Sequence, residues 1–272
     1  MAKKNDLASL LAFVPPFPQI ALEVLDAIRN PLVSVGRLTT LVEKDVALTT
    51  AVLKLANSGL YGRRHSVASV RAAFPVLGVE SFSQAIMRVS VKDFVGVAMA
   101  APELNLCWAH SVATSEIARR LVTGLSLSPD VALSAGLLHD IGRFGLAIAA
   151  PAKHTELLSG GKYFDPIEAE RELFGIDHTE AGRILADQFC LPDEIRVCAG
   201  RHHDPVSGCD VDMLSVVGVA CRIATAVGFQ VVPTHRTLSL EEVVAEAPLP
   251  LRAQILPDAE AWRSVLLQTL AA

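Results

Sequence analysis

The sequence predicts an all-α protein. Apolar residues recur at positions i, i+3, i+4 and i+7 along most of the 272-residue chain, and no sustained alternation of period two is present. Stop signals such as Asn30-Pro31 and Asn57-Ser58-Gly59 separate the periodic segments at helix-length intervals. The chain is also long enough to bury a substantial core.

Residues 1–14 are expected to be a lead-in, and residues 15–100 a bundle of about five short helices. The first helix should stop at Asn30-Pro31, because a residue before proline avoids helical geometry. Ser34 and Asp45 are expected to cap the second and third helices with their side-chain oxygens.

The rest of this bundle follows from the same signals. A short helix is expected to begin at Ser69 and to close at Gly78, since glycine commonly ends a helix. A longer helix with Phe82 and Ile86 facing inward should follow. The polar break near Ala101-Pro102-Glu103 predicts the boundary of the bundle.

A second helical region is expected over residues 101–228. Its first helices are predicted at about 103–124 and from Pro129 to about 143, whereas residues 151–175 are expected to be less regular.

Further helices should begin near Asp177 and Pro192, and another should span about 211–228. The proline-containing tail, residues 229–272, is expected to consist of loops and a last helix near Ala259–Leu270.

Composition and charge exclude several classes of protein. The net charge is −5, no helix carries a Lys/Arg stripe, and no nucleic-acid partner is expected. No run approaches the roughly 18 apolar residues of a membrane helix, so no membrane association is expected. The five cysteines lack Cys-x-x-Cys spacing, which is typical of free thiols in the cytoplasm. The basic loop Tyr61-Gly62-Arg63-Arg64-His65 is interpreted as a solvated loop rather than a contact for an acidic partner.

Four predicted helices each offer an imidazole to what could be one centre. His110 lies on an apolar helical stripe, and His139 and Asp140 are adjacent near the end of the next helix, with Arg143 one turn further. Two later helices add a histidine after the expected N-cap Asp177 and a histidine pair; these residues are His178, His202 and His203.

Imidazoles and a carboxylate from several helices suit a Zn, Fe or Mn site. The alternatives remain open at this point. A single histidine on an apolar face is more often a hydrogen-bonded core residue than a ligand. The pair His202-His203 could also be a solvated helix end, where a cationic side chain favours the helix dipole.

The motifs together resemble a known family. Trp108-x-His110 followed by Ala135-Gly136-Leu137-Leu138-His139-Asp140-Ile141-Gly142-Arg143 resembles the HD superfamily of metal-dependent phosphohydrolases. Over roughly residues 10–228 the chain is similar to the HDOD family, the HD-related output domains of bacterial signalling. The residues that carry this narrower resemblance are Pro15-Pro16-Phe17-Pro18, Leu53-Lys54-Leu55-Ala56-Asn57-Ser58, Glu170 to Gly182, Leu191-Pro192 and His202-His203-Asp204-Pro205.

The resemblance implies a small N-terminal helical bundle packed on an HD-like helical core, and residues 15–228 as one HDOD unit. It implies that six residues match metal-binding positions of catalytic relatives, with a divalent Fe, Mn or Zn as the metal if one is bound: His110, His139, Asp140, His178, His202 and His203. If the site is active, Asp140 and Arg143 are the expected catalytic residues, with Arg143 steadying a phosphate.

The chain departs from the catalytic relatives at three points. Asp204-Pro205 stands where they carry a Gly-Tyr-Pro signature, and Arg143 stands where they tend to have lysine. The final aspartate of the superfamily is replaced by Cys221. A thiolate there could bind metal, but a small core residue is the favoured interpretation.

Two functions follow from the resemblance. The first is a regulatory output module that binds signalling proteins, or a nucleotide second messenger, without catalysis. The second is a metal-dependent phosphohydrolase acting on a nucleotide or cyclic nucleotide, in which the metal would activate water. A single aspartate among the matched residues argues against the second, because a dinuclear site needs a bridging carboxylate.

Overall fold

The computed structural model describes residues 11–12, 14–29, 35–58, 67–96, 104–159, 165–205, 211–232 and 237–271. These residues form helices and turns without a strand, which confirms the predicted all-α fold. The chain divides into two compact units, a small unit of residues 17–96 and a large unit of residues 1–16 and 97–271.

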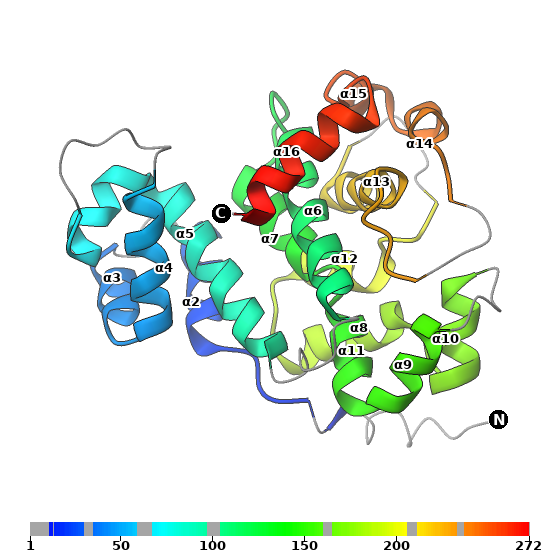
Figure 1. Ribbon diagram of the computed structural model, residues 1–272, viewed down its shortest axis with the longest axis horizontal. Coiled ribbons are helices and arrows are strands. Elements are labelled where there is room, and N and C mark those ends of the chain that lie inside the picture. Colours follow the sequence, from blue (N-terminus) through cyan, green and yellow to red (C-terminus); the bar gives the residue numbers. More distant parts are fainter. Residues whose placement is uncertain are drawn as a thin grey trace. The chain divides into compact units, whose positions relative to one another are not determined.

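The small unit contains the blue and cyan helices of Figure 1: α2 (Gln19–Arg29), α3 (Val35–Glu43), α4 (Val46–Ala56) and α5 (Val70–Gly96). The predicted cap of α4 is confirmed, because Asp45 Oδ1 accepts a hydrogen bond from the backbone N–H of Leu48 at 3.0 Å. The predicted stop at Gly78 is confirmed too, since this residue has a φ of +71° and kinks α5. The predicted cap Ser34 and the loop Tyr61–His65 lie outside the described residues.

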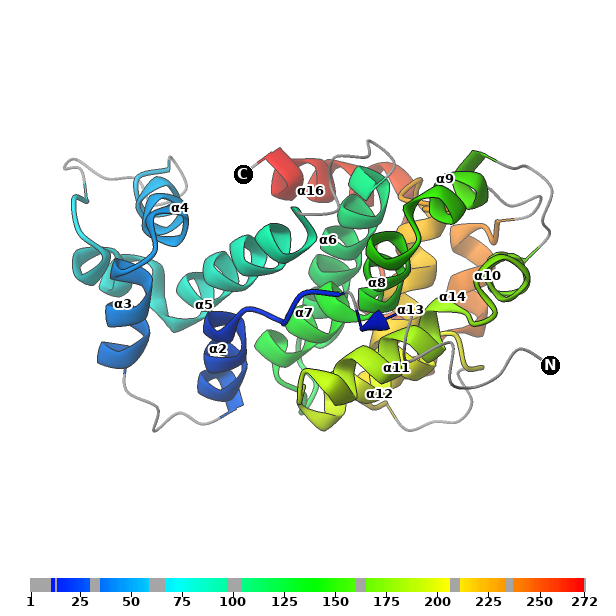
Figure 2. The same cartoon turned by 90° about the horizontal axis from the view of Figure 1, so that it is seen from below.

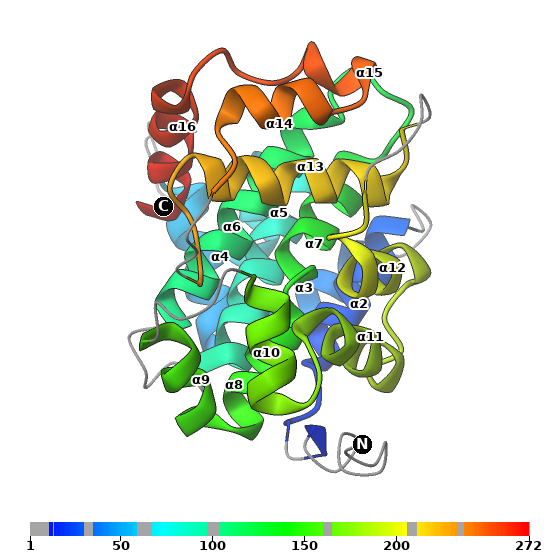
Figure 3. The same ribbon diagram turned by 90° about the vertical axis from the view of Figure 1, so that its right-hand side faces the viewer.

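The large unit begins with α6 (Leu104–Leu121), α7 (Pro129–Leu138) and α8 (Ile141–Ala149), followed by α9 (Pro151–Ser159), α10 (Pro166–Phe174), α11 (His178–Gln188), α12 (Asp193–Arg201) and α13 (Met213–Ala226). Helices α6, α7 and α13 pack against one another, and α11 packs on both α8 and α12 (Figure 2). Three short C-terminal helices complete the unit, and α14 lies on α13 (Figure 3): α14 (Leu240–Glu246), α15 (Leu249–Arg252) and α16 (Ala259–Ala271).

Two glycines allow the helices of the large unit to approach closely. A Cβ on Gly136 of α7 would lie 2.7 Å from the Cα of Ser115 on α6. A Cβ on Gly142 of α8 would lie 1.9 Å from the carbonyl oxygen of His178 on α11. Side chains at both positions would push the backbones apart, so glycine is required for the spacing that brings histidines of different helices together.

Three predicted segments differ from the structure. The single helix expected from Pro129 to about 143 is two helices, with His139 and Asp140 at the junction between them. No proline or glycine stands at this junction and the residues on both sides are buried, so the apolar pattern does not reveal the break.

Residues 151–175 contain α9 and α10, although they were expected to be less regular. Asp165, Pro166 and Gly175 are the N-cap, first residue and left-handed C-terminal residue of α10, so its signals are present in the sequence. The tail contains α14 and α15 in addition to the predicted last helix, and Ser239 with Glu242 forms a capping box for α14.

Residues 129–149 are long and apolar enough to span a membrane by composition alone. However, 89% of the most apolar window in this segment is buried inside the protein. Such burial is typical of a core helix pair, and the segment contributes His139, Asp140 and Arg143 to the site described below.

Candidate metal centre

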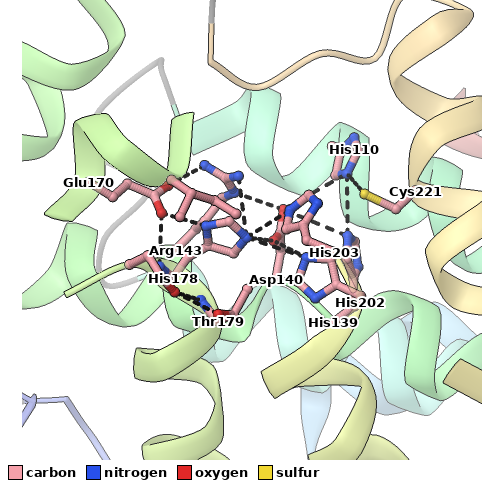
Figure 4. Close-up of polar contacts among 12 residues, drawn as sticks. His110, His139, Asp140, Arg143, Glu170, His178, Thr179, His202, His203 and Cys221 are labelled. Atoms are coloured by element: carbon pink, nitrogen blue, oxygen red, sulfur yellow. Dashed lines mark hydrogen bonds and ion pairs between the residues drawn. The ribbon is translucent and has the colours of Figure 1, made fainter. Parts of the chain in front are cut away.

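The large unit brings all six predicted ligand residues into one cluster (Figure 4). They come from α6, from the junction of α7 and α8, from the start of α11 and from the end of α12: His110, His139, Asp140, His178, His202 and His203. All except His203 are buried in the large unit. The alternative of a solvated helix end is therefore wrong for His202, which is 1% exposed.

The cluster contains two groups of donor atoms. His110, His139 and Cys221 form the first, which we call the Cys221 group; its ligand atoms lie within 4.8 Å of one another. The Nε2 atoms of His110 and His139 are 3.3 Å apart, and Cys221 Sγ is 3.5 Å from His110 Nε2. Cys221 reaches this group from α13 and is 4% exposed.

His178, His202 and His203 form the second group, which we call the three-histidine group. The Nε2 atoms of His178 and His202 are 3.3 Å apart, and His203 Nε2 is 3.0 Å from His178 Nε2. His203 is exposed as a residue, yet its ring lies against the rings of His178 and His202.

Asp140 lies between the two groups. Its Oδ2 atom is 3.9 Å from His110 Nε2 and 3.7 Å from His139 Nε2. Its Oδ1 atom is 3.5 Å from the Nε2 atoms of both His178 and His202, and it makes no hydrogen bond of good geometry with the described residues. One carboxylate thus faces both groups. Asp140 is therefore in the position that a bridging carboxylate of a dinuclear site would need, even though it is the single aspartate among the six residues.

Hydrogen bonds fix the protonation of the four buried imidazoles. The Nδ1 atoms of His110, His139 and His202 lie 2.7 to 2.9 Å from the carbonyl oxygens of Phe229, Gly136 and Cys198 respectively. His178 Nδ1 lies 2.5 Å from a carboxylate oxygen of Glu170. These oxygens only accept, so each Nδ1 carries a proton and the Nε2 atoms of the four rings point into the cluster.

Burial favours the neutral form of three of these rings. It lowers the pKa of His110 and His202, and it lowers the pKa of His139 well below the usual value, although Asp140 opposes the shift in each case. For Asp140 itself burial raises the pKa, but the Arg143 guanidinium and the imidazoles outweigh it and hold the pKa well below the usual range. The cluster therefore combines neutral nitrogen donors with a carboxylate anion.

Arg143 and Glu170 surround the three-histidine group. Arg143 donates from Nε to Asp140 at 3.0 Å and from Nη1 to Glu170 at 2.5 Å, and its Nη2 is 3.4 Å from His178 Nε2. Burial alone would lower the pKa of Arg143, but Glu170 and Asp140 raise it, so the side chain stays charged. Glu170 also accepts from the backbone N–H of His178 at 2.8 Å.

No role was predicted for Glu170 from the sequence. The structure shows that this residue is buried, with 1% of its surface exposed. A signal was available, since Glu170 falls three residues after Ile167 and four before Phe174 on the inner face of α10. Its carboxylate orients His178 in the way that a carboxylate commonly orients a metal-binding histidine.

The donor set fits a divalent transition metal. The Nε2 atoms of His110 and His139 face one another at 3.3 Å with no proton between them, and Asp140 Oδ1 is buried without a hydrogen bond of good geometry. Such unpaired acceptors are costly in a protein interior and are satisfied by a cation.

A cavity of about 390 Å³ opens onto the cluster. Its inner wall includes Asp140, His203 and Cys221, and its outer wall belongs to the C-terminal part of the large unit, including Arg222, Val232 and Glu246. Arg222 forms an ion pair with Glu246 at 3.0 Å across this outer wall.

An all-helical unit in which histidines and an aspartate converge from α6, the α7–α8 junction, α11 and α12 has the arrangement of HD-type proteins. The HDOD domain family model matches residues 14–205, which is more than half of the chain. The chain therefore belongs to the HDOD family.

Known relatives are consistent with this assignment. A curated relative, an uncharacterized protein of Treponema pallidum (strain Nichols), is 25% identical over 202 residues, which are 73% of this chain and 39% of that protein. The chain thus aligns with about two fifths of that relative's length.

Among solved structures, an HDOD domain protein of unknown function from Geobacter sulfurreducens has a TM-score of 0.75 at 23% identity, covering 99% of this chain and 96% of that one. A candidate signal transduction protein of Marinobacter aquaeolei VT8 has the same TM-score at 21% identity, over 97% of this chain and 60% of that one. A candidate phosphohydrolase of Shewanella amazonensis SB2B has a TM-score of 0.67 at 21% identity, over 96% and 93%. At these identities the likeness shows the fold alone.

Proposed function

We propose that the protein is a regulatory signalling module that holds a divalent transition metal and binds a small phosphate-bearing ligand above it, without turnover. The observation that carries the proposal is the convergence of four buried imidazoles, each with Nδ1 engaged elsewhere, on the carboxylate of Asp140. The metal is Fe, Mn or Zn, held by His110, His139, Asp140, His178, His202 and His203.

The cavity supports a small ligand rather than a macromolecule. Its volume of about 390 Å³ lies at the lower end of the range of roughly 300–1,000 Å³ that is common for small-molecule pockets. Arg222 supplies a positive charge for a phosphate, and a metal in the cluster would supply a coordination position for it. Val231, Val232 and Leu238 supply an apolar wall for a base. A nucleotide second messenger has both parts.

We also propose a signalling role and a cytoplasmic location. The name of one structural neighbour, a candidate signal transduction protein, supports a signalling role, and we propose that this role involves a protein partner. A cytoplasmic location is supported by the free thiols of Cys107, Cys190, Cys198 and Cys221.

Elemental analysis tests the metal, and calorimetry tests the ligand. Wild-type protein purified without added metal should contain Fe, Mn or Zn at near-integral stoichiometry, and His139→Ala should lose it. Metal-loaded wild type should bind nucleoside monophosphates, and Arg222→Gln should bind them at least several-fold more weakly. Arg196→Gln removes an exposed arginine of α12 and serves as the control. A metal content of zero in wild type after reconstitution would refute the proposal.

A phosphohydrolase is the second candidate, supported by the cavity that reaches the cluster itself. A divalent metal supplies Lewis-acid activation of a phosphoryl group and of water. Arg143 would hold Asp140 in place, and the buried imidazoles would exclude bulk water. Hydrolysis of bis(p-nitrophenyl) phosphate by the metal-loaded protein, abolished in Asp140→Asn, would establish this candidate over the regulatory one.

A further inference from the structure

Cys221 is the sulfur donor of the Cys221 group. Its helix, α13, lies beyond the residues that the HDOD family model matches. The thiol is nevertheless one of the three side chains of the Cys221 group, and Figure 4 shows its sulfur directed at His110.

The spacing of this group corresponds to tetrahedral coordination. A tetrahedral ion with bonds of about 2.0 Å to nitrogen and about 2.3 Å to sulfur holds two nitrogens roughly 3.3 Å apart, and a nitrogen and a sulfur roughly 3.5 Å apart. The observed separations are 3.3 Å between the two Nε2 atoms and 3.5 Å between His110 Nε2 and Cys221 Sγ. The third pair of the group, His139 Nε2 and Cys221 Sγ, lies within 4.8 Å. A hydrogen-bonded core thiol would also lie about 3.5 Å from an imidazole nitrogen, so the experiments below measure the sulfur–metal bond itself.

Orientation supports the same interpretation. His110 and His139 donate their Nδ1 protons to backbone carbonyls, so their Nε2 lone pairs both point toward the sulfur side of the cluster. Asp140 Oδ2, at 3.7 Å and 3.9 Å from these two atoms, lies slightly beyond tetrahedral spacing and can complete the set by a small rotation.

We propose that Cys221 is a thiolate ligand, and that the Cys221 group with Asp140 is a site for a thiophilic metal, Zn²⁺ or Fe²⁺, in preference to Mn²⁺ or Mg²⁺. Imidazole and thiolate favour these softer ions, whereas the ligands of Mn²⁺ and Mg²⁺ are mainly oxygens. On binding, the thiol proton passes to solvent and a sulfur–metal bond forms without any change of oxidation state. The inference rests on the proposed function only in requiring a bound metal.

X-ray absorption of the Zn²⁺-loaded wild-type protein tests the bond without a mutation. We expect one sulfur at about 2.3 Å in the zinc coordination shell. Co²⁺-loaded wild type should show a sulfur-to-cobalt charge-transfer band in the near ultraviolet. Cys221→Ala should lose this band, whereas Cys198→Ala, which removes another buried thiol, should retain it.

The affinity should change in a metal-specific way. Cys221→Ala should weaken Zn²⁺ binding by at least roughly tenfold, the loss seen even for residues outside the first coordination shell. Its Mn²⁺ affinity should change much less. Stoichiometric metal with only nitrogen and oxygen neighbours would overturn the thiolate but leave the proposed function intact. A failure of wild type to bind any metal would overturn both.

Discussion

The two donor groups on either side of Asp140 are alike in geometry and different in their surroundings. Each contains a pair of Nε2 atoms 3.3 Å apart. The Cys221 group is oriented by backbone carbonyls, those of Gly136 and Phe229. In the three-histidine group, His178 is oriented by the carboxylate of Glu170, and the third donor, His203, is exposed.

This difference separates a rigid group from an adjustable one. Carbonyl oxygens of the backbone cannot change charge, and they orient both histidines of the Cys221 group but only His202 of the three-histidine group. Asp140 and Glu170 both accept hydrogen bonds from Arg143, and Arg143 Nη2 lies 3.4 Å from His178 Nε2. A metal in the three-histidine group must therefore compete with Arg143, and we expect it to bind there more weakly.

Replacing the shared carboxylate should have the largest effect. Asp140→Asn removes the anion that faces both groups and leaves Arg143 with Glu170 alone, so metal binding at either group should be lost. Breaking a buried ion pair of this kind costs about 3–5 kcal/mol of unfolding free energy, measurable by urea denaturation. Asp204→Asn, which breaks an exposed pair with Arg201, should cost no more than about 1 kcal/mol. Full metal content in Asp140→Asn would contradict the bridging position.

Gly142→Ala should weaken metal binding in the two groups to different extents. The added Cβ would lie 1.9 Å from the carbonyl oxygen of His178, so α8 and α11 must move apart, at a cost of about 1–3 kcal/mol. The three-histidine group should lose its metal first, while the Cys221 group retains zinc. Gly96→Ala has nothing within 4 Å of the new Cβ and should be nearly neutral. Equal loss of metal from both groups would show that they are not independent.

Glu170→Gln should weaken only the three-histidine group. The amide keeps the size of the carboxylate but loses its charge, so both the orientation of His178 and the pairing of Arg143 suffer. Metal affinity should fall about 10- to 100-fold in a competitive chelator titration. Glu172→Gln, an exposed change in the same helix, is the matched control. An unchanged affinity would mean that Glu170 serves only to pair with Arg143.

His203→Ala should have the smallest effect. The residue is exposed, so its removal should change the unfolding free energy by no more than about 0.5 kcal/mol. It should weaken metal binding in the three-histidine group less than His178→Ala does. Calorimetric titration with Mn²⁺ compares the two variants directly, and the reverse order would show that the exposed histidine is the stronger ligand.

Much of this centre could be predicted from the sequence. Helical periodicity located α6 and α11, and the joint pattern of His110, His139-Asp140 and the later histidines identified the six residues that meet.

What could not be predicted depends on contacts between distant segments. The break between α7 and α8 leaves no trace in the apolar pattern, yet it sets His139 and Asp140 at a junction. The role of Glu170 depends on Arg143, 27 residues earlier in the chain. Periodicity describes one helix at a time, and both features arise only when helices meet.

The hydrogen bond from His110 to the carbonyl of Phe229 limits where the chain can be truncated without disturbing the cluster. The family match ends at residue 205, so a shortened protein designed from that limit would lack both Cys221 and Phe229. His110 could then carry its proton on either nitrogen and would lose its contact with Cys221, although all six candidate ligands would remain. The residues that shape the cluster therefore extend beyond those that the family match covers.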